Sequence, residues 1–422
     1  TYMKKYHAPL YDAVSAAAAR ASARFCMPGH SGSGSGLYAS APFDLTEIEG
    51  LDNMLCPTGV IREAEDAAAR AWGFKRALFF TAGATSAMHT ALAAARDRGS
   101  VYAVGELHRS FWGGCALLGI CPEIYADEEA FFRTDPRGGT AFFTAVDYCG
   151  VKYREERLLS FCDAHGVTTV ADEAHGAHFA FSELLPQPSR ADAVIYGLHK
   201  TLPVYTAGAL MCLRSDRDAD ASAFYRQRVH TTSPSYTVMA SIDLARARYE
   251  CEGSAVYHMI KEKVKEAFPA RRAGAFGILQ NDDFSRLVLI NEGYAASEFV
   301  LALTEKGIYP EAAIEDKAVF IVTENNAEKL PLLAAEAEKF VPAQKLVRTE
   351  RTAREIRTGG MPCIVDADDC AGFASAGEIG TYPPGVPFIK TGEVFTSADA
   401  EFIKKNAHML FGLVNGRVVV LK

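Results

Sequence analysis

Short apolar runs alternate with helix-like segments through the first half of the chain, and this alternation limits the fold more than any other feature. Each run is four to seven residues long, as buried strands are. Strands separated by helices are typical of a mostly parallel sheet with helices on both faces, so the pattern predicts an α/β fold. The runs lie at residues 77–80, 101–104, 140–146, 167–171, 193–196 and 207–213.

Changes of pattern along the chain predict three parts. Residues 1–40 hold an Ala-rich helix over 10–25 and a Gly-Ser loop, which together form an arm that is too short to be a domain. Residues 41–268 hold the alternating runs and end in a long helix that begins near Ser233. Residues 269–422 are predicted to form a smaller α+β domain.

The predicted C-terminal domain mixes apolar runs with helical segments. Near its end, Asn415-Gly416 separates two apolar runs, which is a turn signal and predicts a terminal hairpin over 413–421. The other predicted elements are strands at 286–290 and 318–322 and helices at 296–306 and 327–339.

Two polar residues stand at the ends of adjacent apolar runs. Asp172 ends the run within Val170-Ala-Asp-Glu-Ala-His-Gly-Ala-His178, and Lys200 follows the next run within Gly197-Leu-His-Lys-Thr-Leu202. Sheets of this class bind ligands at the carboxyl ends of their strands. An acid and a lysine at such ends are what pyridoxal 5'-phosphate (PLP) needs. The lysine holds the aldehyde as a Schiff base, and the acid keeps the pyridine nitrogen protonated.

Each of these residues also has a structural explanation. Asp172 is a common type of helix N-cap after a strand, and Lys200 alone is an ordinary surface lysine. The cofactor site is favoured because the two occur together, with His175 and His199 beside them. His108 follows the run at 101–104 and is either a structural histidine or a residue that stacks on the cofactor ring or transfers protons.

The segment Thr81-Ala-Gly-Ala-Thr-Ser86 follows a predicted strand and opens a predicted helix. Gly83 lets the backbone approach a ligand closely. The amides of Ala84 and Thr85, with the hydroxyls of Thr85 and Ser86, can hold a phosphate at the helix N-terminus. Any strand-to-helix turn looks similar, but beside a PLP lysine this turn is the expected phosphate site.

Two other kinds of site share parts of this pattern. Asp-Glu-Ala-His also occurs in nucleotide-driven helicases, which need an upstream GxxxxGK[ST] loop. The chain contains no Gly-Lys dipeptide, which excludes the helicase interpretation. His175 and His178, with Asp172 and Glu173, are candidate metal ligands. The two histidines are only three residues apart and the chain has no HExxH motif, so we expect no metal site.

Composition narrows the partners and the compartment. The formal net charge of −8 argues against a nucleic-acid or membrane-surface binder. The ten cysteines form no CxxC pairs, which is typical of reduced thiols in a cytoplasmic protein. No run approaches the length of a transmembrane helix, and no signal peptide is visible. We therefore expect a cytoplasmic protein that binds a small molecule and neither nucleic acid nor membrane.

Taken in order, these motifs resemble the Orn/Lys/Arg decarboxylase family, PLP enzymes of fold type I, the aspartate-aminotransferase fold. The resemblance covers most of the chain, whose length is similar to that of the shorter, Gram-positive-type members. It implies a large domain with a mostly parallel seven-stranded sheet. The motifs are Met27-Pro-Gly-His30, Phe43-Asp-Leu-Thr-Glu47, Gly50-Leu-Asp52, Thr81-Ala-Gly-Ala-Thr85, His108-Arg-Ser110, Asp172-Glu-Ala-His-Gly-Ala-His-Phe179, Leu198-His-Lys-Thr-Leu202, Thr232-Ser-Pro-Ser-Tyr236, Ser241-Ile-Asp243, Tyr382-Pro-Pro-Gly-Val-Pro387 and Gly392-Glu393.

The resemblance implies a role for each matching position. Lys200 corresponds to the Schiff-base lysine and Asp172 to the partner of the pyridine nitrogen. His108 corresponds to the imidazole stacked on the ring, Ala174 to the residue on its opposite face, and His175 to a residue near the ring hydroxyl or the substrate carboxylate. The implied phosphate ligands are Ala84, Thr85 and His199. Ser233 resembles a contribution from the neighbouring subunit, which implies a homodimer, or a higher homo-oligomer, with shared sites.

The implied reaction is decarboxylation of an amino acid, arginine, lysine or ornithine, to the corresponding amine. Lys200 or His108 would return a proton to Cα. Candidate acids for the distal cation of the substrate are Glu311, Asp316 and Glu393. The alternatives are another fold-type-I reaction, such as that of an aminotransferase or a lyase, or a non-catalytic member of the family.

Two departures from the family pattern motivate the non-catalytic alternative. The family usually has Ser three residues before the lysine, as a phosphate ligand, where this chain has Gly197. It often has Lys after Pro-Gly-His, where this chain has Ser31. Loss of one hydroxyl hydrogen bond costs about 1 kcal/mol, and more when the acceptor is charged. Gly197 therefore bears on the affinity for the cofactor more than on its identity.

Overall fold

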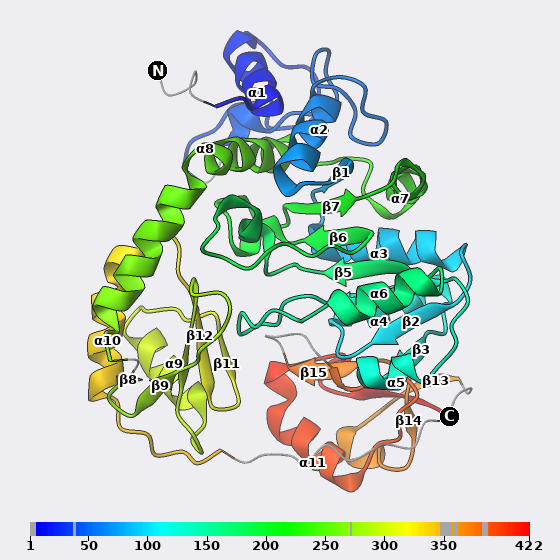
Figure 1. The fold of residues 1–422 in the computed structure, drawn as a ribbon, viewed down its shortest axis with the longest axis vertical. Coiled ribbons are helices and arrows are strands. Elements are labelled where there is room, and N and C mark those ends of the chain that lie inside the picture. Colours follow the sequence, from blue (N-terminus) through cyan, green and yellow to red (C-terminus); the bar gives the residue numbers. More distant parts are fainter. Residues whose placement is uncertain (1–5, 37–38, 271, 347–356, 358–360, 382–386) are drawn as a thin grey trace.

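The computed structural model describes residues 6–36, 39–270, 272–346, 357, 361–381 and 387–422. A seven-stranded sheet lies at the centre of the molecule, in the order β1-β7-β6-β5-β4-β2-β3 (Figure 1). Strands β2 to β6 run parallel, whereas β7 runs antiparallel to both β6 and β1. The predicted α/β fold with a mostly parallel seven-stranded sheet is confirmed. The strands are β1 (Arg76–Phe80), β2 (Val101–Val104), β3 (Glu123–Tyr125), β4 (Thr140–Thr144), β5 (Thr168–Asp172), β6 (Ala193–Tyr196) and β7 (Ala209–Leu213).

Both faces of this sheet are buried, which explains why its strands are almost continuously apolar. Neighbouring residues of one strand point to opposite faces. Phe79 and Phe143 lie in the core on one face, and Phe80 and Phe142 lie in the core on the other. A strand with a solvated face would instead alternate apolar and polar residues.

Helices cover the two faces in separate groups. Helices α3, α4 and α7 pack on one face, and α2, α6 and α8 pack on the other. Two of these helices begin beside the site described below: α3 follows β1, and α4 follows β2. The helices are α2 (Val60–Trp72), α3 (Gly83–Arg96), α4 (Arg109–Leu118), α5 (Glu128–Phe132), α6 (Glu156–Ala164), α7 (Asp216–Val229) and α8 (Tyr236–Ala267).

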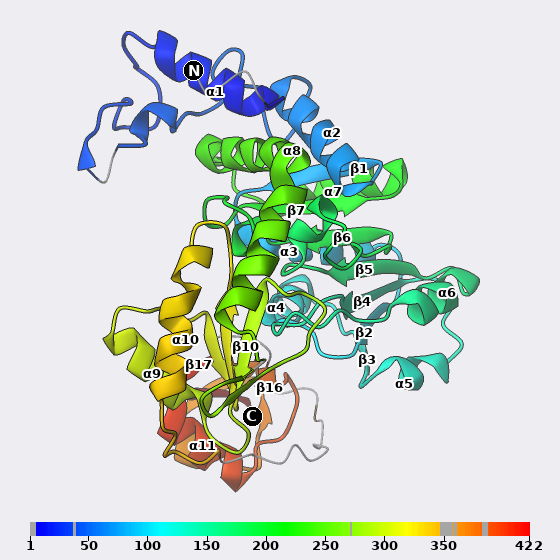
Figure 2. The same ribbon diagram turned by 60° about the vertical axis from the view of Figure 1, so that its left-hand side comes forward.

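The N-terminal segment packs on the long helix α8. Helix α1 (Pro9–Arg20) begins where Asp243 Oδ2 accepts hydrogen bonds from the amides of Leu10 (2.9 Å) and Tyr11 (3.3 Å). It ends at Arg20, five residues before the predicted end, and Phe25 is fully exposed. Figure 2 shows α1 and the loop after it projecting beyond α2 and α8. The short helix η2 (Ala41–Phe43) ends this loop.

Helix α8 connects the central sheet to the second part of the molecule. It has 32 residues, so it spans about 48 Å. Its far end packs against α10, beside a five-stranded antiparallel sheet in the order β11-β12-β10-β9-β8 (Figure 1). None of the helices in the described part of the chain is both long and apolar enough to cross a membrane. This region contains β8 (Arg272–Ala273), β9 (Phe276–Ile278), β10 (Arg286–Ile290), α9 (Ala296–Glu305), β11 (Ala312–Ile314), β12 (Lys317–Ile321), η5 (Ala327–Lys329) and α10 (Leu330–Lys339).

The last described residues form a separate group that contacts α4, where Arg109 lies over the ring of Phe411 and Lys390 lies over the ring of Trp112. It consists of two three-stranded sheets, β13-β18-β14 and β16-β15-β17, around their own apolar core. The boundaries predicted at residues 40 and 268 remain predictions. The elements are β13 (Pro362–Val365), η6 (Ala367–Asp369), β14 (Ala374–Ser375), β15 (Ile379–Thr381), β16 (Pro387–Ile389), α11 (Ser397–Asn406), η7 (Ala407–Met409), β17 (Leu410–Phe411) and β18 (Val418–Leu421).

The predicted terminal hairpin is wrong in its strand pairing, although its turn is present. Asn415 and Gly416 both have positive φ, 53° and 77°, and a single antiparallel bridge joins Val414 to Arg417. Beyond that bridge, β17 pairs with β15, and β18 pairs with β13 and β14. Val418 and Val420 are fully buried in the core of this group, so burial against distant strands outweighs the local pairing.

Candidate functional site

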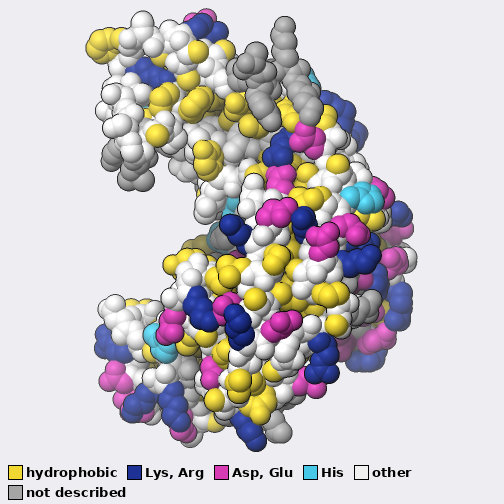
Figure 3. Space-filling model, turned by 90° about the vertical axis from the view of Figure 1, so that its left-hand side faces the viewer, with side chains coloured by type: hydrophobic (Ala, Val, Ile, Leu, Met, Phe, Trp, Pro, Cys, Tyr) yellow, Lys and Arg dark blue, Asp and Glu magenta, His cyan; other side chains and the backbone are white. Residues whose placement is uncertain are grey.

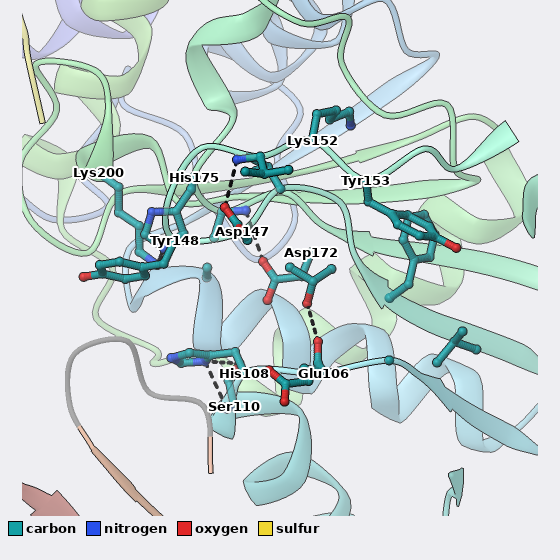
Figure 4. Close-up of a pocket in the computed structure, with 18 of the residues that line it drawn as sticks. Glu106, His108, Ser110, Asp147, Tyr148, Lys152, Tyr153, Asp172, His175 and Lys200 are labelled. Atoms are coloured by element: carbon teal, nitrogen blue, oxygen red, sulfur yellow. Dashed lines mark hydrogen bonds between the residues drawn. The ribbon is translucent and has the colours of Figure 1, made fainter. Parts of the chain in front are cut away.

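A cavity of about 860 Å³ opens at the carboxyl ends of β2, β4 and β5, beside the N-terminus of α3 (Figure 4). Its lining comes from segments that are far apart in the sequence. Eight of the nine residues to which the family resemblance assigns a role at the cofactor line it, and Ser233 does not. The eight residues are Ala84, Thr85, His108, Asp172, Ala174, His175, His199 and Lys200.

Asp172 is the last residue of β5, and only 9% of its surface is exposed. Its Oδ1 accepts a hydrogen bond of 3.1 Å from the amide of Ala174, which closes the turn after the strand. Oδ2 makes no hydrogen bond to the residues that the structure describes, so it is available to a ligand in the cavity. Asp172 can therefore close the turn through Oδ1 and contact a ligand through Oδ2 at the same time.

Lys200 ends the short helix η4 (Leu198–Lys200), which follows β6 directly. Its Nζ lies 3.1 Å from Nε2 of His175. Burial lowers the pKa of the Lys200 amine below its usual range, and the negative charge of Asp172 opposes this shift. A lysine with a lowered pKa has a larger fraction of neutral, nucleophilic amine near neutral pH.

His175 lies between two basic side chains, those of Lys200 and Arg286. Its Nδ1 is 3.3 Å from Nη2 of Arg286, on the opposite side of the ring from Lys200. The ring of Tyr148 packs edge-on against the imidazole, with centroids 4.6 Å apart. Burial, together with the charges of Lys200 and Arg286, holds the pKa of His175 well below its usual range. His175 is therefore a neutral imidazole at neutral pH.

His108 is the N-cap of α4, and its side-chain contacts fix the ring. Nδ1 accepts a hydrogen bond of 3.2 Å from the amide of Ser110 and lies 2.9 Å from Oγ of the same residue. Burial lowers the pKa of His108 to about 4, against the opposing charge of Asp172. Figure 4 shows the imidazole at the wall of the cavity below Tyr148. A neutral, fixed ring of this kind is suited to stacking on a flat aromatic ligand.

The N-terminus of α3 forms a corner of the cavity where backbone amides are available. No side chain caps this helix, and Gly83 has φ 77°, which orients the following amides of Ala84 and Thr85. Uncapped amides at a helix N-terminus attract anions. The predicted contribution of Ser86 is wrong, because its Oγ donates to the carbonyl of Gly83 (2.9 Å) and the residue is outside the lining of the cavity.

His199 lies close to this corner with its Nδ1 3.1 Å from the carbonyl oxygen of Gly208. A carbonyl can only accept, so Nδ1 carries a proton. Burial lowers the pKa of His199. The ring would donate to a phosphate through Nε2 only as the imidazolium, which a bound anion favours electrostatically.

Gly197 lies against Ala174 and Lys200, two residues that line the site. A Cβ atom at this position would lie 3.0 Å from the carbonyl oxygen of Ala174 and 3.2 Å from Cδ of Lys200. The backbone amide of Gly197 donates to the same carbonyl over 3.2 Å. Glycine at position 197, where the family usually has serine, therefore removes a hydroxyl and also avoids crowding around the side chain of Lys200.

Ser233 is exposed and lies outside the cavity of its own chain. Its amide donates to Oγ1 of Thr231 over 3.1 Å. A role in the site would therefore require a second subunit, and the role remains a prediction. The departure at Ser31 also lies outside the cavity lining, and residues 382–386 of the Tyr382 motif lie outside the described residues.

The acids predicted to bind the distal cation are outside the lining of the cavity, although Glu311 is close enough to Lys200 to favour its ammonium form. Glu311 is exposed and bonded to the hydroxyl of Tyr148. Asp316 is buried beside Lys317, and Glu393 accepts the amide of Lys390 over 2.8 Å. None of the three lines the cavity as described. The acids that do line it, besides Asp172, are Glu106, Asp127, Glu128 and Asp147.

Two acidic and basic pairs next to the site are structural. Glu173 is fully buried and bonded to Nζ of Lys152, and it also accepts the amide of Ser189 over 3.0 Å. His178 is fully buried with Nε2 3.1 Å from Oδ2 of Asp283. Within the described residues, no three His, Cys, Asp or Glu side chains are grouped as metal ligands are.

Sequence reasoning missed Arg286 entirely. The residue opens β10, far from Lys200 in the sequence, and it is only 2% exposed. A charged residue directly before the apolar run at 287–290 is the signal that was present, but such residues are usually on the surface. Only the contact with His175 identifies its place in the site.

Comparison with known proteins points to one family. A family model described as "Orn/Lys/Arg decarboxylase, major domain" matches residues 8–130 and 123–284. The chain is 26% identical to the uncharacterized protein YaaO of Bacillus subtilis, with 94% of each chain covered. It is 23% identical to arginine decarboxylase of the same organism, with 96% of this chain and 94% of the relative covered.

Structural similarity agrees with the sequence match. The crystal structure of the lysine decarboxylase LdcF of Francisella novicida has a TM-score of 0.76 to this chain at 16% identity. The similarity covers 99% of this chain and 82% of that one, and it shows that the fold is shared. Because the family model matches more than half of the chain, the chain belongs to the Orn/Lys/Arg decarboxylase family of fold-type-I, PLP-dependent enzymes.

Proposed function

We propose that this protein is a PLP-dependent enzyme that removes the α-carboxylate of arginine, lysine or ornithine as CO₂ and releases the corresponding amine. The observation that carries the proposal is that Lys200, Asp172 and His108 line one cavity beside the uncapped N-terminus of α3. Membership of a decarboxylase family supports the type of reaction.

The described residues fit PLP at each end of the cofactor. Lys200 offers a primary amine of lowered pKa for the aldehyde, and Oδ2 of Asp172 is available to the pyridine nitrogen. His108 and Ala174 would contact the two faces of the ring. The phosphate would bind the amides of Ala84 and Thr85, with the imidazolium of His199 beside them.

When bound, PLP supplies an electron sink for the negative charge that remains on Cα when CO₂ leaves. Asp172 keeps the positive charge of the sink in place, because a carboxylate favours a protonated ring nitrogen. Lys200 would hold the cofactor until the amine of the substrate took its place. Its lowered pKa makes its ammonium form a stronger acid than that of an ordinary lysine, so Lys200 is suited to return a proton to Cα.

His108 is less suited to that proton transfer. With a pKa of about 4 it is neutral near pH 7, and a neutral imidazole is a very weak acid. Its nitrogen Nδ1 already accepts from Ser110. We therefore propose that His108 orients the ring of the cofactor and that Lys200 returns the proton.

Acids line the cavity away from Lys200 and can bind the distal cation of a basic substrate, and Lys152 and Arg154 line it as well. Figure 4 shows Lys200 and Tyr153 at opposite ends of the residues drawn. The hydroxyl of Tyr153 is bonded to Glu128, which lines this far end, and Glu106 also lines the cavity. Of the other acids in the lining, Asp127 and Asp147 accept nearby backbone amides, and Glu128 itself also lies 3.5 Å from Nη1 of Arg157. We propose that Glu106 and Glu128 bind the distal cation of the substrate.

The test of the reaction is incubation of the full chain and PLP with arginine, lysine and ornithine in turn, with detection of CO₂ and the matching amine. We expect both products from at least one substrate and from none when Lys200→Ala replaces the wild type. A keto-acid product would contradict decarboxylation in favour of an aminotransferase. Absence of cofactor absorbance after reconstitution would contradict the enzyme and favour a non-catalytic member.

The proposed cation site predicts the effect of Glu128→Gln. Loss of a charged hydrogen bond costs about 1.5–3 kcal/mol, so we expect KM for the basic amino acid to rise about tenfold or more with a smaller change in kcat. Glu129→Gln is the matched control, because Glu129 is exposed on the same helix and does not line the cavity. Equal KM values for the two variants would remove Glu128 from the substrate site.

We also propose that the protein is a homodimer. Large hydrophobic side chains on the N-terminal arm are exposed, with Phe25 at 102%, Met27 at 73% and Phe43 at 41%. Figure 3 shows hydrophobic side chains on this arm above a hollow in the surface. A second subunit that covers the arm would bury this apolar surface and would bring its own Ser233 toward the site.

A further inference from the structure

Three side chains form a line that ends at the reactive amine. Arg286 Nη2 lies 3.3 Å from His175 Nδ1, and His175 Nε2 lies 3.1 Å from Lys200 Nζ. Arg286 comes from β10, whereas His175 and Lys200 follow β5 and β6 of the central sheet. The line therefore joins the second part of the molecule to the amine in the cavity.

The donor and acceptor roles along this line follow from Arg286. A guanidinium has only N–H donors, so Nδ1 of His175 must accept. A neutral imidazole with a bare Nδ1 carries its proton on Nε2. Nε2–H then points at Lys200 Nζ, and it makes a hydrogen bond only if that nitrogen has a lone pair. An ammonium group at Lys200 has none, so the arrangement favours the neutral amine.

Arg286 is held rigidly enough to impose this arrangement. Its amide donates to the carbonyl of Asp283 (3.0 Å), and its own carbonyl accepts from Nδ2 of Asn281 (2.7 Å). Its Cβ lies against Gly150, where an added Cβ would come within 2.8 Å. The side chain is 2% exposed, and Nη1 has no hydrogen-bond partner among the described residues. Among the described residues, His175 is the side chain that the guanidinium contacts within hydrogen-bond distance, and the charge of Arg286 also favours the ionised carboxylates of Asp147 and Asp283.

The surrounding charges act in the same direction around His175. Besides Arg286 and Lys200, the titratable groups that face this imidazole are His108, His199 and the phenol of Tyr148, and the charged forms of the two histidines would oppose its protonation. Around Lys200, Asp172 and Glu311 favour the ammonium form, whereas Arg286 opposes it. The protonation of Lys200 is therefore a balance in which Arg286 acts both through its charge and through His175.

We propose that Arg286 is a positioning residue that fixes the Nε2–H tautomer of His175 and thereby holds Lys200 of the cofactor-free protein as the neutral amine. The inference rests on the proposed function only in taking Lys200 as the amine that attaches the cofactor. A neutral amine condenses with an aldehyde by forming a C–N bond, and the carbonyl oxygen leaves as water with the two amine protons. An ammonium group must lose a proton first, so Arg286 prepares the lysine for attachment.

The first test measures the titration of Lys200 without cofactor or substrate. The full-length, cofactor-free protein is labelled with limiting acetic anhydride across a range of pH, and modification of each lysine is read by mass spectrometry. Lys265, exposed on α8, is the internal reference. We expect the midpoint for Lys200 to lie below that of Lys265. In Arg286→Met we expect it to move upward by about one pH unit, since one unit matches one hydrogen bond of about 1.4 kcal/mol.

Arg272→Met is the matched control, because Arg272 is exposed on β8 of the same sheet. It should leave the midpoint of Lys200 unchanged, and Lys265 should not move in any variant. An unchanged midpoint for Lys200 in a folded Arg286→Met protein would overturn the proposal. A merely structural role for Arg286 would lower the unfolding temperature without a selective shift at Lys200.

The second test is read on the wild type, and it uses a variant only to assign the resonances of His175. In ¹⁵N-histidine-labelled, cofactor-free protein, the His175 resonances are assigned by their loss in His175→Gln. We expect the proton on Nε2 and a bare Nδ1, whereas a proton on Nδ1 would overturn the proposal. Neither test involves substrate or turnover. A protein without decarboxylase activity can therefore still support the inference, and an active enzyme can still contradict it.

Discussion

At the scale of single residues, burial of His108 couples the site to the stability of the fold. The pKa of this imidazole falls from its usual 6.5 to about 4 because it is buried. In the unfolded chain the same group binds a proton at a higher pH, near 6.5. The stability that the neutral ring contributes is therefore complete above about pH 6.5, and it is lost as the pH falls toward about 4.

This coupling predicts the behaviour of His108→Gln. Glutamine keeps an acceptor for the amide of Ser110 but does not titrate, so the free energy of unfolding should fall less between about pH 6.5 and about pH 4 than in the wild type. Urea unfolding of the cofactor-free protein at several pH values measures this difference. The buried histidines that remain affect both proteins alike. His408→Gln, an exposed change on η7, should keep the wild-type slope. An equal slope in His108→Gln would contradict the prediction.

Gly197 makes a second prediction at this scale. In Gly197→Ala the new Cβ would press on the carbonyl of Ala174 and on the stem of Lys200, displacing the lysine from its preferred rotamer at a cost of about 1 kcal/mol. We expect affinity for PLP to fall about fivefold. Gly197→Ser should recover part of this loss, because its hydroxyl adds a donor for the phosphate. Titration with PLP, monitored by the absorbance of the bound cofactor, measures the affinity of each variant. Equal affinity for Gly and Ala would exclude the steric effect.

At the scale of elements, α8 packs against the segment that follows His175. Gly253 of α8 faces Phe181, the last residue of η3 (Ala177–Phe181), and an added Cβ would lie 2.7 Å from Phe181 Cβ and 2.8 Å from its carbonyl oxygen. Helix propensity alone favours Ala over Gly by about 1 kcal/mol. Contact with the backbone of η3 reverses this preference, because the carbonyl cannot move as a flexible side chain does.

We therefore expect Gly253→Ala to lower the free energy of unfolding by about 1–2 kcal/mol, in spite of the better helix former. Cys251→Ala, an exposed change two residues earlier on the same helix, should be close to neutral. Urea unfolding of the three proteins at one pH gives the comparison. A stabilised Gly253→Ala protein would mean that η3 yields easily and that α8 does not set its position.

At the scale of the whole molecule, the proposed homodimer predicts complementation between two inactive variants. Lys200→Ala removes the reactive amine, and Ser233→Trp places a bulky side chain on the surface predicted to enter the partner's site. If the sites are shared, a random mixture of refolded subunits contains hybrids with one intact site. Such a mixture should regain about a quarter of the wild-type activity. A mixture that stays inactive would place Ser233 outside the partner's site.

Much of the central sheet could be predicted from the sequence because its signals are local. Apolar runs of four to seven residues with helices between them identify six of the seven strands within a few residues. Strand β3 was missed, because Glu123–Tyr125 is a short edge strand with exposed residues and no apolar run. In the C-terminal region, β13 to β17 are two to four residues long, and their pairing depends on distant strands.

The sequence by itself determined the kind of site. Asp172, Lys200 and the turn at Gly83 each follow an apolar strand, and parallel strands end at one edge of the sheet, so these residues had to meet. Only the tertiary structure decided how they are controlled. The contact of Arg286 with His175, the far acids Glu106 and Glu128, and the strands that β18 joins all depend on segments brought together by packing. Local sequence patterns do not predict such contacts, because a contact of this kind contributes energy only when distant parts of the chain are buried against each other.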